Sequence, residues 1–245
     1  MSNVLLSGFD IFNGDLNDLP DNKLLISTIN AHSFNLTQDD SVFTSAIRNS
    51  DVLIPDGISV VWAIRLLTGM KLKKIAGADL FFYELARLDK SGGSCFFLGS
   101  SESTLGKITA RAAIEYPGVK IGKYSPPYKA EFTADDNRMM TEAVNSFKPD
   151  VLFVGMTAPK QEKWAYLHKD RLDTKHICCI GAVFDFYAGT ITRAPDWMIR
   201  LGLEWFYRLI REPSRMWRRY LIGNTKFIWL ILKEKAGFRK AEPSN

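Results

Sequence analysis

The stretch DVLIPDGISVVWAIRLL, residues 51–67, decides the fold. It begins as a short apolar run, turns at Pro55-Asp56-Gly57, and continues as an apolar segment with helical spacing. A short apolar run, a turn and a longer helical segment together are typical of one strand–helix unit in a parallel sheet. The stretch therefore predicts a βα unit, and the rest of the chain can be compared with it.

The same rhythm recurs on both sides of this stretch. The predicted strands are residues 24–30, 51–54, 95–98, 119–122, 151–154 and 177–180. The predicted helices between them are residues 58–67, 80–88, 105–116, 137–147 and 161–172. Alternation of this kind predicts an α/β fold, with a mainly parallel sheet flanked by helices on both faces.

Composition divides the chain near residue 193. With 245 residues, 46% of them hydrophobic, the chain can bury a sizeable core, which excludes a disordered or collagen-like protein. Residues 193–240 hold 12 Lys and Arg against four Asp and Glu, whereas residues 1–192 hold 20 against 22. Four of the six Trp also lie beyond residue 193. We therefore expect a near-neutral α/β domain, 1–192, and a basic, Trp-rich helical appendage, 193–245.

The sequence carries no sign of export or membrane insertion. Its first residues lack the basic start and the long apolar core of a signal peptide. No segment reaches the roughly 18–20 apolar residues that span a bilayer. The three cysteines sit in apolar, strand-like runs, which predicts buried thiols in a reducing cytosol rather than metal ligands. These features predict a cytoplasmic protein.

Polar residues and glycines follow most of the predicted strands. In an open parallel sheet, ligands bind at the carboxyl ends of the strands, where helix N-termini offer N–H groups to a phosphate. The residues expected there are Thr28, Asn30, Asp56, Gly57, Gly99, Gly155, Gly181 and Asp185. The Walker A pattern and G-x-G-x-x-G are both absent, which weakens an ATPase or NAD-dependent function. A nucleotide-sugar epimerase or dehydrogenase stays as an alternative.

Three of these motifs have a structural and a functional interpretation. Asp56 is either the N-cap of the next helix or a carboxylate that takes a proton from a substrate hydroxyl, with Gly57 allowing close approach. Lys160, Gln161 and Glu162 crowd a first helical turn, where a lysine is unfavourable unless an anion shares the site. Lys74, Gly77 and Asp79 form either a solvated turn or part of the ligand site.

A divalent metal is not expected. Many enzymes that use nucleotide sugars hold Mn²⁺ or Mg²⁺ on the diphosphate with a D-x-D triplet, and this chain contains none. If the ligand is a diphosphate, Lys, Arg and helix N-termini must offset its charge.

The appendage has the pattern of basic amphipathic helices. Trp197, Leu201, Trp205 and Leu209 recur every four residues as an apolar stripe, and Pro213 is expected to end that helix. The cations are Arg208 and Arg211 before the proline and Arg215, Arg218 and Arg219 after it. This pattern predicts contact with a membrane surface. The alternatives are a helical layer with solvated charges and, with no supporting motif, a nucleic-acid surface.

Seven ordered motifs resemble the WecG/TagA/CpsF glycosyltransferase family across nearly the whole chain. They are TINA (28–31), PDGISVVW (55–62), AGADL (76–80), FLG (97–99), VG with PKQE (154–155, 159–162), GAVFD with AG (181–185, 188–189), and RAPDW with GLEW, RL, EPSR and RY (193–197, 202–205, 208–209, 212–215, 219–220). The resemblance implies a Rossmann-like core with a C-terminal helical appendage.

The resemblance also implies an activity. Such enzymes are inverting and metal-independent, and they act at the inner membrane face in the synthesis of teichoic acid, capsule and exopolysaccharide. The expected donor is a UDP-sugar carrying N-acetylmannosamine, its uronic acid or a hexose, and the expected acceptor is a polyprenol-diphosphate-linked saccharide. A homo-oligomer is possible, and no nucleic acid is expected. A non-catalytic membrane scaffold is the non-enzymatic alternative.

Residue roles carry over by motif. Asp56 matches the proposed catalytic base, Thr28 and Asn30 match residues near the sugar, Gln161 matches a donor-pocket residue, and Asp185 is expected near the nucleoside. Arg208, Arg215 and Arg218 match cations of the appendage that close over the diphosphate or the acceptor. Lys74 stands where family members usually carry Arg; it keeps the charge but loses bidentate phosphate geometry.

Overall fold

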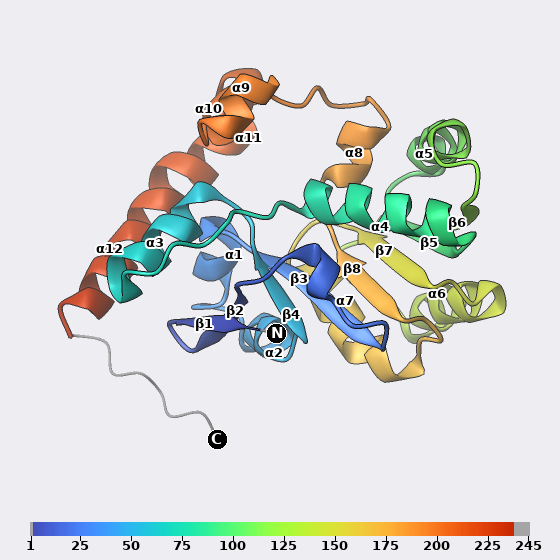
Figure 1. Cartoon of the computed structure of the whole chain (residues 1–245), viewed down its shortest axis with the longest axis horizontal. Coiled ribbons are helices and arrows are strands. Elements are labelled where there is room, and N and C mark those ends of the chain that lie inside the picture. The colour runs from blue at the N-terminus through green and yellow to red at the C-terminus, as the bar shows by residue number, and fades with distance from the viewer. Residues whose placement is uncertain (1, 238–245) are drawn as a thin grey trace.

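The central element is a six-stranded parallel sheet, seen in the computed structural model of the protein, which describes residues 2–237 apart from the side chain of Asp196 (Figure 1). Its order is β4-β3-β8-β7-β5-β6. The strands are β3 (Leu24–Ile29), β4 (Val52–Pro55), β5 (Ser94–Gly99), β6 (Lys120–Tyr124), β7 (Val151–Gly155) and β8 (His176–Cys179). All six predicted strands are confirmed, and so is the Rossmann-like α/β fold class.

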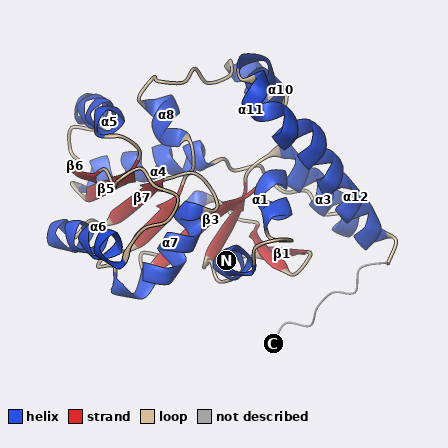
Figure 2. Cartoon of the chain, turned by 180° about the vertical axis from the view of Figure 1, so that it is seen from behind, coloured by secondary structure: helices blue, strands red, loops and turns tan. Residues whose placement is uncertain are grey.

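Helices cover both faces of the sheet, as predicted. One face carries α4 (Gly77–Ser91), α5 (Glu102–Glu115) and α8 (Val183–Tyr187), packed on the sheet through Phe81, Phe97, Phe153 and Phe184. The other carries α6 (Ala134–Phe147) and α7 (Lys160–His168), packed through Phe96, Leu152 and Trp164 (Figure 2). Phe96 and Phe97 point to opposite faces because side chains alternate along a strand.

A third layer lies beside β4 and was only partly predicted. It consists of an antiparallel hairpin, β1 (Asn3–Leu6) and β2 (Phe9–Phe12), with α1 (Ala31–Leu36), α2 (Ser41–Arg48) and α3 (Ile58–Thr68). These elements enclose a separate apolar cluster that includes Phe9, Phe34 and Phe43. The helix α3 was predicted from the sequence, whereas the hairpin, α1 and α2 were not.

The C-terminal segment is helical, as predicted, but is more broken than the expected stripe. It comprises α9 (Asp196–Arg200), α10 (Glu204–Arg211), α11 (Pro213–Trp217), the π-helix η3 (Arg218–Ile222) and α12 (Gly223–Lys235). The prediction of one continuous apolar stripe from Trp197 to Leu209 is wrong. Gly202, at φ +73°, ends α9, so that Trp197 and Trp205 lie on separate helices. Pro213 begins α11, which confirms the predicted break there.

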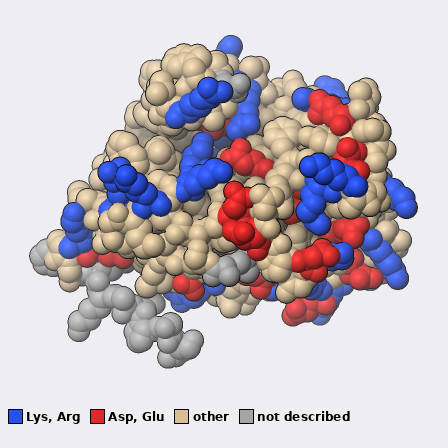
Figure 3. All heavy atoms as spheres, viewed as in Figure 1, with Lys and Arg blue, Asp and Glu red and all other residues tan. Residues whose placement is uncertain are grey.

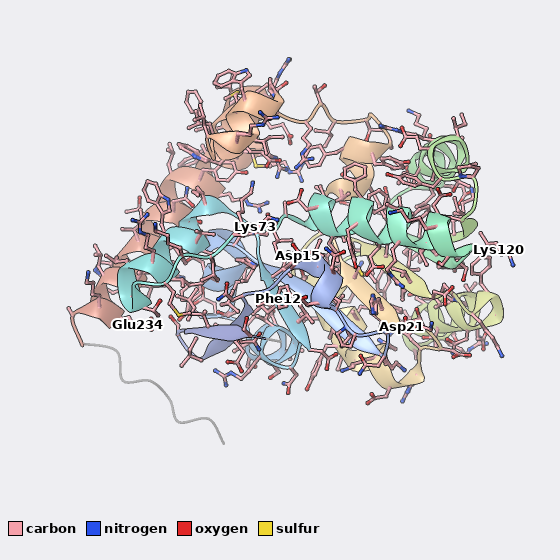
Figure 4. All side chains as sticks on the ribbon, in the orientation of Figure 1. Phe12, Asp15, Asp21, Lys73, Lys120 and Glu234 are labelled. Carbon is pink, nitrogen blue, oxygen red and sulfur yellow. The ribbon has the colours of Figure 1, made fainter. Side chains whose placement is uncertain are left out.

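The last helix packs against the third layer instead of standing apart. Phe227 of α12 is buried edge-on against Phe34 of α1, with ring centroids 5.1 Å apart. Asn35 donates a hydrogen bond to the carbonyl of Gly223 at 2.7 Å. Ser7 of the hairpin bonds Glu234, which Figure 4 places near the end of α12. Residues 193–237 therefore touch the α/β domain at both ends of α12; residues 238–245 of the predicted appendage lie outside the described residues.

Two short 3-10 helices and one buried ion pair complete the frame. The 3-10 helices are η1 (Leu16–Asp18) and η2 (Lys169–Arg171). At the amino end of β8, His176 Nδ1 lies 2.7 Å from Glu84 of α4, and Glu84 also accepts a hydrogen bond from Arg87. Both His176 and Glu84 are buried. Since a buried charge needs a partner, this pair fixes α4 on the sheet far from the carboxyl ends of the strands.

Replacing Phe227 is expected to release α12. Phe227→Ala removes a fully buried ring, which costs about 3–5 kcal/mol. If that cost falls on the docking of α12, proteolytic cleavage within residues 223–237 accelerates by roughly a hundredfold or more. Ile228→Ala, at the exposed neighbouring position, is the control and should leave the cleavage rate nearly unchanged. Equal cleavage of both variants would contradict the packing described here.

Candidate functional site

A large cavity of about 1250 Å³ opens at the carboxyl ends of the strands. Its walls come from the loops after β3, β4, β5, β6, β7 and β8, and from the helices α10, α11 and η3 on the opposite side. Of the residues predicted for the site, those that line the cavity are Thr28, Asn30, Asp56, Gly57, Lys74, Gly77, Gly155, Lys160, Gln161, Glu162, Gly181, Asp185, Arg208, Arg215 and Arg219. The topology thus gathers residues from sequence positions 28 to 219 in one place.

Asp56 follows β4 and is held by its backbone, not by its side chain. Its N–H donates to the carbonyl of Ile29 at 2.8 Å, which ties it to the end of β3. The N-cap alternative is wrong, because the N-cap of α3 is Gly57, at φ +114°, and no side chain caps that helix. Among the described residues, the Asp56 carboxyl has no hydrogen-bond partner. It is therefore free to bond to a ligand.

Opposing charges surround Asp56. Loss of hydration, together with the charge of the nearby Glu204 of α10, raises the pKa of its carboxyl to about 6. Lys74 and Arg219 act in the opposite direction. A carboxyl with a pKa near 6 is mostly ionised at pH 7 and is still basic enough to accept a proton, which is what a general base requires.

The end of β3 contributes an amide and an imidazole. The Oδ1 of Asn30 caps α1 by accepting from the N–H groups of His32 and Ser33 at 3.0 and 3.1 Å. Only its amide nitrogen is left for a ligand. His32 also lines the cavity, and burial together with the charge of Arg219 lowers its pKa to about 4. It therefore presents a neutral ring at physiological pH.

The ends of β7 and β8 meet at Gln161. This side chain accepts hydrogen bonds from the N–H groups of Met156 and Gly181, both at 3.2 Å, and donates to Glu162 at 2.8 Å. Burial raises the pKa of Glu162 to about 7. The first turn of α7 thus supplies to the cavity a buried amide and a buried carboxyl that titrates near neutral pH.

Lys160 has partners within the protein. Its ammonium donates to the carbonyl of Lys129 at 2.5 Å and lies 3.6 Å from the centre of the Phe132 ring. Both partners belong to the loop between β6 and α6, which also lines the cavity. The predicted anion is therefore not required to explain this lysine, whose charge is satisfied by a carbonyl and an aromatic face.

Three of the predicted glycines have packing roles. A Cβ at Gly155 would lie 2.2 Å from the ring of Phe184, and one at Gly99 would lie 2.4 Å from the carbonyl of Gly155. At Gly77 it would lie 3.0 Å from the carbonyl of Ile180. Glycine at these positions lets α8, α4 and neighbouring strand ends approach closely. Gly99 itself does not line the cavity.

The C-terminal helices bring cations to the cavity. Arg208 of α10, Arg215 of α11 and Arg219 of η3 line it, and the charges of Arg208 and Arg215 face Asp185. The Nε atoms of Arg208 and Arg219 are buried and have no hydrogen-bond partner among the described residues. Guanidinium groups placed this way can bind the oxygens of a phosphate.

Four predicted residues lie outside the cavity. Asp79 accepts a hydrogen bond from the N–H of Ala76 at 2.8 Å, in a capping role at the start of α4. Arg211 borders a smaller cavity of about 280 Å³ and lies over Tyr207. Arg218 is exposed and lies over the ring of Trp217. The next residue of the same π-helix, Arg219, lines the cavity instead. The fourth is Gly99.

Several lining residues were not predicted as site residues. They include His32, Arg193, Glu204, Trp205, Tyr220 and Asn224. His32 directly follows the strand-end motif, which was a usable signal. Glu204, Trp205 and Tyr220 lie within the motifs quoted above, but their direction depends on how the C-terminal helices pack.

Lys73, the neighbour of Lys74, does not line the cavity. It lies near Asp15, with the Lys73 Nζ and an Asp15 carboxyl oxygen 3.9 Å apart (Figure 4).

Residues 2–237 contain no cluster of three or more His, Cys, Asp or Glu arranged to hold a metal ion. The absence of a divalent metal from the reaction stays a prediction. Over the same residues, no helix has the length and apolar character needed to cross a membrane.

Comparison with known proteins adds the chemistry. The sequence model of the glycosyl transferase WecG/TagA/CpsF family matches residues 15–241. The chain is 32% identical over 211 residues to the N-acetylglucosaminyldiphosphoundecaprenol N-acetyl-beta-D-mannosaminyltransferase of Bacillus subtilis (strain 168), covering 86% of this chain and 80% of that protein. It is 26% identical over 225 residues to the protein of the same name from Staphylococcus aureus (strain MW2), covering 90% and 84%.

The charge balance around Asp56 can be tested without any substrate. Glu204→Gln removes the carboxylate that raises the pKa of Asp56, so the midpoint of the Asp56 titration should fall below about 6. Arg219→Gln removes a stabilising cation and should move the midpoint upward. Carboxyl ¹³C shifts followed by NMR over a pH series measure both. The control is Glu142→Gln on the exposed side of α6; an unchanged midpoint in Glu204→Gln would contradict the assignment.

Proposed function

Because the chain belongs to the WecG/TagA/CpsF family of glycosyl transferases, we propose that it transfers an N-acetylmannosaminyl group from a UDP-sugar to a polyprenol-diphosphate-linked N-acetylglucosamine. The family match covers residues 15–241, and relatives named as N-acetylmannosaminyltransferases that act on N-acetylglucosaminyldiphosphoundecaprenol align over most of the chain. Family membership favours a transferase over the epimerase, the dehydrogenase and the non-catalytic scaffold. The related uronic acid or a hexose in place of N-acetylmannosamine is the alternative donor.

The observation that carries the proposal is the free carboxyl of Asp56 opposite three arginines. In the proposed step, Asp56 takes the proton of an acceptor hydroxyl while that oxygen forms a bond to the anomeric carbon of the donor. The bond from this carbon to the UDP oxygen breaks, and UDP leaves with the electron pair. Attack from the face opposite UDP inverts the configuration.

The arginines and Lys74 suit the leaving diphosphate. Arg208, Arg215 and Arg219 reach the cavity from the C-terminal helices, and Lys74 from the loop before α4. Fixed cations near a departing diphosphate stabilise the developing charge, so the reaction would need no divalent metal. A volume of about 1250 Å³ exceeds that of a usual single-ligand pocket, which leaves room for both a donor and the head group of an acceptor.

Activity is expected with UDP-N-acetylmannosamine and a polyprenol-diphosphate-linked N-acetylglucosamine in the presence of EDTA. Asp56→Asn should lower kcat by about 10²–10⁴-fold, because the amide cannot accept the proton. Asp56 must be ionised to act, so log(kcat/KM) should fall with unit slope as the pH drops below about 6. Release of UDP over a panel of UDP-sugars measures all three.

The control for this experiment is Asp135→Asn, an exposed carboxylate on α6. Near-normal turnover by Asp56→Asn would exclude the base assignment. A strict requirement for Mn²⁺ or Mg²⁺ would exclude the metal-free mechanism. If only another UDP-sugar supports turnover, that sugar is the donor, and the proposed class of reaction is retained.

The outer surface of the C-terminal helices favours attachment to the inner face of the cell membrane. Large apolar side chains are exposed there: Trp197, Leu201, Phe206, Ile210, Trp217, Leu221, Ile222, Ile228, Trp229 and Leu232. In Figure 3, Lys and Arg lie over this part of the molecule, on the left, whereas most of the visible Asp and Glu lie in the middle and on the right, among further Lys and Arg. Apolar and cationic groups together bind an anionic leaflet, with about 1 kcal/mol for each cation near the surface.

Vesicle binding tests this surface. Deleting the whole segment would also remove the buried Phe227, so the exposed double variant Trp217→Gln/Trp229→Gln is the better choice. Its sedimentation with phosphatidylglycerol vesicles should weaken at least tenfold, while its melting temperature stays close to that of the wild type. Ile114→Gln, at an exposed position on α5, is the control. Undiminished binding of the double variant would exclude this surface as the anchor.

A further inference from the structure

Two adjacent buried polar side chains form the floor of the cavity. Gln161 and Glu162, in the first turn of α7, are 1% and 2% exposed, although both line the cavity. Burying polar groups costs stability, so a buried polar pair of this kind indicates a purpose beyond packing. Neither is explained by the capping of α7, because no side chain caps that helix.

The carboxamide of Gln161 has one defined orientation. Its Oε1 accepts from two backbone N–H groups, those of Met156 after β7 and Gly181 after β8, at 3.2 Å each. Its Nε2 donates to Glu162 Oε1 at 2.8 Å, the shortest of the three bonds. An amide nitrogen carries two hydrogens. The second hydrogen has no partner among residues 2–237, so it is available to a ligand.

Glu162 has a free atom as well, but an inaccessible one. Its Oε2 is buried and has no hydrogen-bond partner among the described residues. Leaving such an oxygen unsatisfied costs stability. Its contribution must therefore come through Oε1 and the bond to Gln161.

We propose that Glu162 is the positioning residue of the transferase site: it holds the Gln161 carboxamide so that the free Nε2 hydrogen points to an oxygen of the bound donor. This inference rests on the proposed function, since it needs a donor in the cavity. Gln161 is the residue that touches the donor, and Glu162 acts through it. The raised pKa of Glu162 agrees with this role, because the protonated form still accepts the amide hydrogen through its carbonyl oxygen and repels a diphosphate less than a carboxylate does.

A structural role and a positioning role of Glu162 predict different activities for two variants. Glu162→Gln keeps an acceptor oxygen facing Gln161 Nε2 and should retain kcat/KM within a few-fold. Glu162→Met removes the acceptor, and kcat/KM for the donor should fall roughly tenfold to a hundredfold, the effect of one lost hydrogen bond to substrate. Its melting temperature should change little, because the unsatisfied Oε2 is removed too.

A control on the same helix separates catalysis from loosening of α7. Trp164→Phe removes a buried hydrogen bond to Asn137, away from the cavity. It should lower the melting temperature and leave kcat/KM unchanged. In a Gln161→Ala background, Glu162→Met should have no further effect, because the residue acts through Gln161.

A spectroscopic measurement makes the inference independent of turnover. The side-chain ¹⁵N–¹H signals of Gln161 should shift as Glu162 titrates, and Glu162→Gln should abolish that shift even though Asp56 still titrates in the same cavity. Addition of the UDP-sugar should move the same signals. Equal loss of activity from Glu162→Gln and Glu162→Met, or additive loss in the Gln161→Ala background, would overturn the inference. Absence of turnover with every UDP-sugar would overturn the proposed function instead.

Discussion

The contact between Phe34 and Phe227 is the interaction on which the functional site depends. It joins α1, which begins at the edge of the cavity, to α12, which follows the arginine-bearing segment. The hydrogen bond from Asn35 to Gly223 reinforces the contact at the first turn of α12. With α12 docked, Arg219 and Tyr220 lie on the cavity wall opposite the strand ends. The polar residues at the strand ends and the cations of the C-terminal helices are thus parts of one packed unit.

Electrostatics then explains why a nearly neutral α/β domain can host a charged reaction. Within the cavity, Asp56 and Glu204 oppose Lys74 and Arg219, and partial burial strengthens every one of these interactions. The same environment keeps His32 uncharged and raises the pKa of Glu162 to about 7. Because water is partly excluded from the cavity, a few fixed cations are enough to offset the charge of an anionic ligand. The remaining excess of positive charge lies on the outer surface of the C-terminal helices, where it is available to an anionic partner.

The sheet and most of the cavity could be predicted from the sequence. Each strand is a short apolar run followed by a polar or glycine residue, and a parallel sheet collects those residues at one edge. This logic placed Asp56, Gln161 and Asp185 at the strand ends. The hairpin β1–β2 escaped prediction, because strands of four residues give too few positions for a clear alternation. The capping role of Asp79 and the partners of Lys160 depend on side-chain directions, which no spacing rule fixes.

The C-terminal segment was the least predictable part. Helical periodicity marked its cations correctly but assigned Trp197 and Trp205 to one stripe, because Gly202 was read as part of a helix. Matching by motif favoured Arg218, whereas the cavity is lined by Arg219. The difference arises at the π-helix, which a periodicity of 3.6 residues does not anticipate.

That π-helix separates two properties that a regular α-helix would tie together. A π turn holds one residue more than an α turn, so removing one residue from 218–222 would convert it to an α turn and leave α12 in register. Phe227 would then keep its contact with Phe34. The deletion would instead act on the segment that carries Arg218 and Arg219, and so on the cation presented to the cavity. One extra residue thus allows the cavity wall to change while the docking of the last helix is retained.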